Sequence, residues 1–221
     1  MLSRGSCQVG GRAPMWFRTA LAPRVPLRLL CGMKICVFCS SSDAVDSAYG
    51  AVAAELGALI GGGGHSLVYG GGRVGLMGAA ARAAQEKGAR VIGIIPEFMN
   101  RPGVPNLDCD ELLYTKDMRE RKARMIEMSD AFVALPGGFG TLEEISEVIT
   151  QKQFDFLKAP LVAVNTEGFY DHLAAFFERF YERRFAKPAF RATCPFVPGP
   201  AEAMAYIREY TPPAPTSKWF T

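Results

Sequence analysis

Hydrophobic positions along this chain form short apolar runs, which alternate with longer stretches where they recur about every 3.6 residues. The short runs are bounded by glycine, proline or polar residues, so we predict strands over residues 35–39, 66–69, 90–95, 111–114, 130–135 and 161–164. The longer stretches predict helices near residues 45–60, 75–86 and 117–128, from 141, from 169 and over 200–210. Strands that alternate with helices indicate an α/β fold, a Rossmann-like doubly wound parallel sheet with helices on both faces, in a single domain.

The predicted domain covers residues 34–210, and both ends of the chain differ from it in composition. Residues 1–33 contain arginines and prolines but no acidic residue, and we interpret them as an N-terminal extension. Such a segment is typical of a mitochondrial presequence, whereas Met33, directly before the first strand, favours an upstream extension. We therefore expect a cytoplasmic protein, with a mitochondrial one as the alternative. Residues 211–221 are rich in proline and predict a loose tail.

Composition and charge argue against two classes of partner. Hydrophobic residues make up 49% of the chain and 23 positions are glycine, which suits a globular α/β protein. No apolar run reaches the roughly 20 residues of a membrane-spanning helix, so we expect no membrane partner. Residues 1–33 hold five arginines, so the rest of the chain carries −2 of the net charge of +3. A nearly neutral body does not suit nucleic-acid binding through a basic face.

The cysteines and histidines indicate neither a disulfide framework nor a metal site. Cys36 and Cys39 have the spacing of a redox pair, but they lie within a predicted strand, whose alternation sends their side chains to opposite faces. We interpret them as buried thiols. His65 and His172 are far apart and have no partners at metal-ligand spacing.

Residues 130–144 form the strongest candidate for a functional site. They predict an apolar strand and a helix, joined by a turn that contains Gly137, Gly138, Phe139, Gly140 and Thr141. Such a turn suits a phosphate, because backbone N–H groups and the positive end of the helix dipole face outward. Its glycines are also what a tight turn with positive φ requires, without any ligand. Glu143 and Glu144 add carboxylates beside the anion site, which indicates chemistry on a phosphorylated substrate. The alternative is a capping box, in which Glu144 accepts the N–H of Thr141.

Several motifs occur together in this chain. Residues 136–144 read Pro-Gly-Gly-Phe-Gly-Thr-Leu-Glu-Glu, and further serine-rich, glycine-rich and basic motifs occupy residues 37–42, 69–78 and 118–122. Taken in their order along the chain, the four blocks resemble those of the LOG (Lonely Guy) family of cytokinin riboside 5′-monophosphate phosphoribohydrolases, whose motif is PGGxGTxxE. The resemblance extends from about Lys34 to about Tyr210.

The resemblance implies roles for residues in each block. It assigns catalysis to Glu144 and Arg121, with Arg121 as a fork for the phosphate, the ribose hydroxyls or Glu144. It places Lys122 and Glu143 in contact with the substrate. The other residues that it assigns to phosphate or substrate binding are Ser40, Ser41, Gly71, Gly72, Gly75, Met77, Gly137, Gly138, Phe139, Gly140, Thr141 and Thr150.

Simpler structural roles are open for parts of this set. Ser40 and Ser41 belong to a serine cluster that also suits a turn, and Ser40 stands where the family has glycine. We interpret Arg119 and Arg124 as a solvated basic face. The glycines of residues 70–75 lack the spacing and the downstream acid of a dinucleotide fingerprint, so dinucleotide binding is not expected.

The function implied by the resemblance is hydrolysis of the N-glycosidic bond of a purine nucleoside 5′-monophosphate, which releases the free base and ribose 5-phosphate. Family analogy favours an N6-modified adenine, giving an active cytokinin, with AMP as a weaker substrate. The resemblance implies no metal or organic cofactor, and it implies a homodimer. The alternative is a non-catalytic nucleotide or molybdenum-cofactor carrier on the same fold, in which Arg121 and Glu144 have no chemical role.

Overall fold

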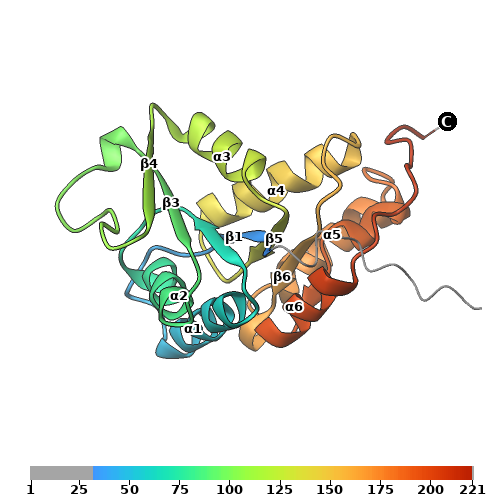
Figure 1. The fold of residues 1–221 in the computed structure, drawn as a ribbon. Coiled ribbons are helices and arrows are strands. Elements are labelled where there is room, and N and C mark those ends of the chain that lie inside the picture. The colour runs from blue at the N-terminus through green and yellow to red at the C-terminus, as the bar shows by residue number, and fades with distance from the viewer. Residues whose placement is uncertain (1–31, 221) are drawn as a thin grey trace, which may run out of the picture.

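The computed structural model describes residues 32–220, which form one parallel sheet covered by helices (Figure 1). The strands follow the order β4-β3-β2-β1-β5-β6-β7, and every described pair of neighbours is parallel. Their bounds are β1 (Lys34–Phe38), β2 (Ser66–Tyr69), β3 (Val91–Pro96), β4 (Glu111–Thr115), β5 (Ala131–Ala134), β6 (Leu161–Val164) and β7 (Phe196–Val197). The order reverses direction between β1 and β5, which confirms the predicted doubly wound, Rossmann-like α/β fold.

Helices cover both faces of the sheet (Figure 1). One face carries α1 (Ser47–Gly62), α2 (Gly75–Glu86) and α6 (Pro200–Glu209). The other carries α3 (Met118–Glu127), α4 (Phe139–Gln153) and α5 (Asp171–Glu182). The predicted helices are therefore all present, with boundaries that differ by a few residues.

Alternation along the central strands divides the core into two apolar clusters, one on each face. In β1, Ile35 and Val37 face the helices α1 and α2, whereas Cys36 and Phe38 face α3 and α4. Cys39 belongs to the first cluster, so Cys36 and Cys39 point to opposite faces as predicted. Both thiols are free and buried.

Two helix starts differ from the predictions for local reasons, and one short strand was not predicted. Helix α1 begins at Ser47 because the side chain of Asp46 caps it, accepting the N–H of Ala48 at 2.9 Å, so Val45 lies outside the helix. Helix α4 begins at Phe139, two residues before the predicted start at Thr141. Strand β7 has only two residues, too few to show a periodicity in the sequence.

The segment after α6 makes contacts that the prediction of a loose tail did not include. The ammonium of Lys218 lies 3.9 Å from the ring centre of Phe154, at the end of α4. Arg184 and Lys187 approach the ring of Phe220. Within residues 32–220 no helix has both the length and the apolar character needed to cross a membrane. The presequence and extension hypotheses concern residues 1–33, of which 1–31 lie outside the described residues.

Candidate active site

The turn between β5 and α4 leaves several hydrogen-bond donors free. Helix α4 starts after Gly138, which provides no side-chain cap, and the first N–H groups of any helix lack intrahelical partners. The Thr141 hydroxyl is buried in this turn, and the described residues include no hydrogen-bond partner for it. A Cβ at Gly138 or Gly140 would meet no atom within 4 Å, so open space lies beside these amides. Donors around an open space form a cradle suited to an anion.

The glycine at the base of the cradle is required by packing. A Cβ at Gly137 would lie 2.2 Å from Oγ1 of Thr141 and 2.7 Å from its Cβ. No side chain therefore fits at Gly137 without displacing Thr141. The two kinds of glycine differ, since Gly137 allows the turn to close, while Gly138 and Gly140 keep its outer side open.

Two further turns meet the cradle at the carboxyl ends of β1 and β2. Ser40 donates its N–H to the carbonyl of Pro136 at 3.2 Å, and its own carbonyl accepts the N–H of Met77 at 3.3 Å. Gly75 has a φ of 62°, and a Cβ there would lie 2.5 Å from the carbonyl oxygen of Ser42. The reversal of strand order thus gathers the three predicted motifs at one edge of the sheet.

The serine turn has a clear structural role. The hydroxyl of Ser40 accepts the N–H of Ser42 at 3.0 Å, which is the turn-forming role considered above. Ser40 is not among the described residues with positive φ, so serine replaces the family's glycine there without strain. Ser41 is exposed. Beside this turn and the cradle lies a largely apolar hollow of about 270 Å³, lined by Ser40, Val45, Tyr49, Leu76, Gly137 and Phe169.

Glu144 is buried below the cradle, with 5% of its surface exposed. Because α4 begins at Phe139, Glu144 lies in its second turn and faces the core, so the capping-box alternative is wrong. Burial raises the pKa of Glu144 to about 7, with the positive charge of Arg121 opposing the rise and the neighbouring Glu143 adding to it. A carboxyl group with a pKa near neutrality can act as either a proton donor or a proton acceptor.

Arg121 is buried on α3 and contacts the backbone of β3 and of the turn after β2. Its Nε–H donates to the carbonyl of Ile94 at 3.1 Å, and its Nη2 donates to the carbonyl of Gly70 at 3.3 Å. A Cβ at Gly70 would lie 1.8 Å from Nη2 of Arg121, so glycine makes this approach possible. Among the described residues Arg121 forms no ion pair with Glu144, although its charge lowers the pKa of that carboxyl. Its Nη1 also donates to the sulfur of Met118 at 3.8 Å. The N–H groups that these contacts do not use are left for a ligand.

Lys122 and Glu143 are paired with each other in this structure. The Lys122 ammonium contacts the Glu143 carboxylate and lies 2.8 Å from the Glu147 carboxylate, one turn further along α4. Although burial alone would lower it, the pKa of Lys122 is raised by these two carboxylates. Arg119 and Arg124, on the same helix, are exposed as predicted. The Lys122–Glu143 pair ties α3 to α4 beside the two buried site residues.

The glycine turn after β2 is packed against Met77 and against a distant loop. Gly71 has a φ of 70°, and a Cβ at Gly72 would lie 2.9 Å from the sulfur of Met77. The carbonyl of Gly71 accepts the N–H of Asn106 at 2.8 Å, and Asn106 also donates to the hydroxyl of Tyr69 at 2.9 Å. The segment between β3 and β4 is therefore fastened to the glycine turn by the buried Asn106, which sequence reasoning missed.

Thr150 lies apart from the other predicted residues. It is nine positions after Thr141 on α4, or about 14 Å along the helix axis. Its hydroxyl donates to the carbonyl of Ser146 at 2.8 Å. Its neighbours in a hollow of about 400 Å³ between α4 and α5 include Phe177, Phe180 and Phe185. Within one chain, the fold does not bring Thr150 to the cradle.

Tyr170 is a second residue that sequence reasoning missed. Its hydroxyl donates to the carbonyl of Leu135 at 2.7 Å, directly before the cradle. Its backbone N–H donates to the side chain of Asn165 at 2.6 Å, and its ring packs against Phe169 and Phe196. Only its position in the aromatic run 169–170 was visible in the sequence, and nothing there indicated a partner 35 residues earlier.

Comparisons with known proteins decide the family. The protein-family model described as "Possible lysine decarboxylase" matches residues 77–207. A cytokinin riboside 5′-monophosphate phosphoribohydrolase of Arabidopsis thaliana is 40% identical over 179 residues, which are 81% of this chain and 83% of that protein. A probable enzyme of the same name from Oryza sativa subsp. japonica is 39% identical, over 81% of this chain and 85% of its own. The chain belongs to the LOG family. It is thus a member of a family of N-glycosidic hydrolases.

Solved structures confirm the fold of this LOG-family chain. The molybdenum cofactor carrier protein of Chlamydomonas reinhardtii superposes with a TM-score of 0.63 and 22% identity, covering 80% of this chain and 97% of that one. The molybdenum cofactor binding protein of Rippkaea orientalis gives a TM-score of 0.63 at 21% identity, with 80% and 96% covered. At these identities the similarity concerns the fold alone.

Proposed function

We propose that the chain hydrolyses the N-glycosidic bond of cytokinin riboside 5′-monophosphates, that is, of AMP modified at N6, with AMP as a weaker substrate. Water adds to the anomeric carbon of the ribose, the bond to the base nitrogen breaks, and that nitrogen leaves with a proton. The products are the free base, an active cytokinin, and ribose 5-phosphate. The LOG-family relatives support this assignment through the activity in their names.

The observation that carries the proposal is the position of Glu144. It is a buried carboxyl group, its pKa is raised to about 7, and it lies one turn behind an uncapped helix N-terminus with open space beside its amides. Binding an anion alone does not require a buried carboxyl group at this place. A reaction that develops positive charge on a ribose does, because a carboxylate stabilises an oxocarbenium-like transition state.

Each residue of the site then has a distinct role. The amides of Gly138, Phe139 and Gly140 and the hydroxyl of Thr141 hold the 5′-phosphate, which fixes the ribose without entering the reaction. Glu144 stabilises the charge on the ribose or activates the attacking water. Arg121 offers its remaining N–H groups to the substrate and keeps part of the Glu144 population ionised at neutral pH.

The direct test is an incubation of the protein with N6-isopentenyladenosine 5′-monophosphate, AMP and the two corresponding ribosides, followed by chromatography of the free bases. We expect base release from the monophosphates and none from the ribosides, because only the former carry the phosphate that the cradle holds. The ratio between the two nucleotides measures the base preference. Equal release of base from the ribosides would show that binding of the 5′-phosphate by the cradle is not needed for the reaction.

The carrier hypothesis is the second candidate, because the solved structures of this fold named above are molybdenum cofactor carriers or binding proteins. A carrier would bind a nucleotide or cofactor tightly and leave it intact. Mass spectrometry of the purified protein distinguishes the two, since an enzyme releases its products. Retention of an intact ligand, together with no base release, would favour the carrier.

We further propose that the active form is a homodimer. Phe139, at the start of α4, is 92% exposed, and Phe176 and Phe185 on and after α5 are 56% and 84% exposed. A second copy packed against α4 and α5 would cover these rings and the hollow that contains Thr150. Sedimentation velocity tests this, with a dimer expected and a monomer at all concentrations contradicting it.

A further inference from the structure

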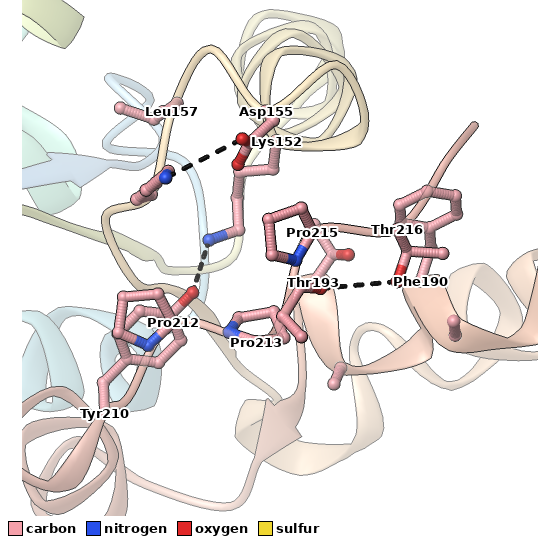
Figure 2. Close-up of a pocket in the computed structure, with 14 residues that line it drawn as sticks. Lys152, Asp155, Leu157, Phe190, Thr193, Tyr210, Pro212, Pro213, Pro215 and Thr216 are labelled. Atoms are coloured by element: carbon pink, nitrogen blue, oxygen red, sulfur yellow. Dashed lines mark hydrogen bonds and ion pairs between the residues drawn. The ribbon is translucent and has the colours of Figure 1, made fainter.

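The end of α4 that is remote from the cradle contains a second unusual ionisable group. A small cavity of about 60 Å³ lies between the end of α4, the 3-10 helix Pro188–Thr193 and the segment after α6. Figure 2 shows Lys152 extending from α4 towards Tyr210, with Pro212, Pro213 and Pro215 of the C-terminal segment bordering the space beside it. This cavity is far smaller than cofactor pockets, which measure roughly 300–1,000 Å³.

Lys152 has two hydrogen-bond acceptors in the described part of the chain. Its Nζ donates to the carbonyl of Ala159 and, at 2.9 Å, to the hydroxyl of Tyr210. It also lies 5.0 Å from the centre of the Tyr210 ring. A neutral amine has two N–H groups and one lone pair, whereas an ammonium has three N–H groups and no lone pair. In the neutral form these two acceptors satisfy both N–H groups and leave the lone pair unused.

No negative charge balances Lys152 among residues 32–220. The carboxylate of Asp155, which also borders the cavity, pairs with Lys158 at 3.7 Å. Burial raises the pKa of the nearby Cys194 thiol to about 12, so this thiol is neutral at physiological pH. Burial lowers the pKa of Lys152 to about 8, because the ammonium loses hydration and gains no carboxylate partner.

Two hydroxyl groups at the cavity have donor protons available. The Tyr210 oxygen accepts from Lys152, and the described residues provide no acceptor for its own proton. Thr193 is buried, borders the cavity and has no side-chain hydrogen bond among those described. At pH 8 about half of the Lys152 side chains are unprotonated. Such an amine next to free hydroxyl donors, at a cavity of this size, suits a small neutral electrophile that becomes anionic when the amine adds to it.

We propose that Lys152 is a site of reversible carbamylation by carbon dioxide. The Nζ lone pair forms a bond to the carbon of CO₂, one C=O π bond opens onto oxygen, and one N–H proton leaves to solvent. The product is a carbamate anion that keeps one N–H for the carbonyl of Ala159. The hydroxyls of Tyr210 and Thr193 donate to its oxygens. The small volume of the cavity suits a molecule of the size of CO₂.

The experiment maps the carbamate on the intact protein. The chain is equilibrated at pH 8 with isotope-labelled bicarbonate, the carbamates are fixed by ethylation with a trialkyloxonium salt, and labelled lysines are located by peptide mass spectrometry. An ordinary lysine has a pKa of about 10.4, so little of it is unprotonated at pH 8. We therefore expect about 10-fold more label on Lys152 than on exposed lysines. Label spread evenly over the lysines would overturn the proposal.

Variants separate covalent addition from other effects. Lys152→Arg keeps a cation but removes the reactive amine, so the label at this peptide is expected to vanish. Lys158→Arg, at the same cavity, is the matched control and retains the label. Tyr210→Phe keeps the ring and lowers the label severalfold. Thermal unfolding tests whether each variant is folded. If a variant does not fold, the distribution of label over the lysines of the wild-type protein still decides the question.

One alternative occupant is an inorganic anion held by an Lys152 ammonium. Such binding leaves no ethylated lysine and protects the protein against heat in chloride or phosphate, and this combination would contradict carbamylation. None of these measurements involves base release. Failure of the carbamylation proposal would therefore leave the proposed function untouched, and the reverse also holds.

Discussion

Helix α4 carries a partly or fully buried ionisable side chain towards each of its ends, and the two ends differ in what surrounds that group. Near the N-terminus, burial raises the pKa of the Glu144 carboxyl to about 7, and the charge of Arg121 limits the rise. Near the C-terminus of α4, burial lowers the pKa of the Lys152 amine to about 8, and no carboxylate of residues 32–220 opposes the shift. Burial thus moves both pKa values towards neutral pH, and the neighbouring residues determine which chemistry each group supports.

The space around the two groups differs as well. Glu144 lies behind free amides and glycines with open space beside them, which suits a ligand with a charged phosphate. Lys152 faces a small cavity that is partly lined by prolines, which suits a very small molecule. An acid with a nearby cation and an open cradle supports catalysis, while an amine without a counter-charge supports simple addition chemistry.

The largest effect is expected when the Arg121 guanidinium is removed from beside the N-terminal end of α4. Arg121→Met removes the larger of the two positive charges that lower the pKa of Glu144, and Lys122 keeps the smaller one. The pKa of Glu144 therefore rises above about 7, and less of it is ionised at neutral pH. Because a guanidinium contact to substrate is lost as well, we expect kcat/KM at pH 7 to fall by about 10²-fold or more. The acid limb of the pH–rate profile should also move to higher pH.

The control for this variant is Arg124→Met on the same helix. Arg124 is exposed and pairs only weakly with Glu120, at 3.9 Å. Its removal should leave the pH–rate profile in place. A profile that shifts equally in both variants would show that general charge, rather than the buried guanidinium, governs Glu144.

The buried carboxyl group also predicts a pH-dependent stability. Glu144 has a folded-state pKa of about 7, above its ordinary value of 4.5, so between these values the folded state binds the extra proton. Its contribution to stability is present below pH 4.5 and is lost as pH rises through 7, which amounts to about 3 kcal/mol. Glu144→Gln should therefore stabilise the protein by up to that amount at pH 8.

Denaturant unfolding at two pH values measures this effect. At pH 4 the wild type and Glu144→Gln should have similar free energies of unfolding, because protonated Glu and Gln are both neutral. A variant less stable than the wild type at pH 8 would show that the Glu144 carboxylate stabilises the fold, which contradicts the assignment of a pKa near neutrality.

A glycine substitution separates stability from binding at the cradle. Gly140→Ala adds a methyl group in open space within a helix, so it should stabilise the fold by up to about 1 kcal/mol. The same methyl group obstructs the approach of phosphate, and we expect KM for the monophosphate to rise about tenfold. Gly50→Ala is the matched control, because Gly50 lies in α1 and also has nothing within 4 Å. It should stabilise the fold without changing KM.

The smallest effect is expected at Tyr170. Tyr170→Phe keeps the ring contacts and removes the 2.7 Å hydrogen bond to the carbonyl of Leu135, at the entry to the cradle. Losing one neutral hydrogen bond costs about 1 kcal/mol, so KM should rise about fivefold while kcat changes little. A purely structural role would instead lower the melting temperature and leave KM unchanged.

The sequence predicted the architecture and most of the N-terminal end of α4, because both follow local patterns. Alternating apolar runs and glycine turns indicate a parallel sheet, and turns that follow β1, β2 and β5 must meet at one edge. The inward position of Glu144 was not predictable from spacing alone. It depends on whether α4 begins at Phe139 or Thr141, and glycine N-caps give a weak start signal.

The C-terminal end of α4 had no signal of its own. Lys152 acquires its surroundings from Ala159 and from Tyr210, 58 residues later, and such contacts leave no periodicity in a single sequence. Tyr170 and Asn106 were missed for the same reason. Thr150 lies outside the four motifs, and its position away from the cradle likewise depends on helix geometry.

The central claim is that Glu144 carries out hydrolysis beside a phosphate cradle. The most direct measurement compares wild type and Glu144→Gln in single-turnover release of N6-isopentenyladenine from its riboside 5′-monophosphate. We expect the wild type to release the base and the variant to bind the nucleotide with its rate lowered by about 10²–10⁴-fold or more. A variant that binds the nucleotide and hydrolyses it at a near-normal rate would contradict the account.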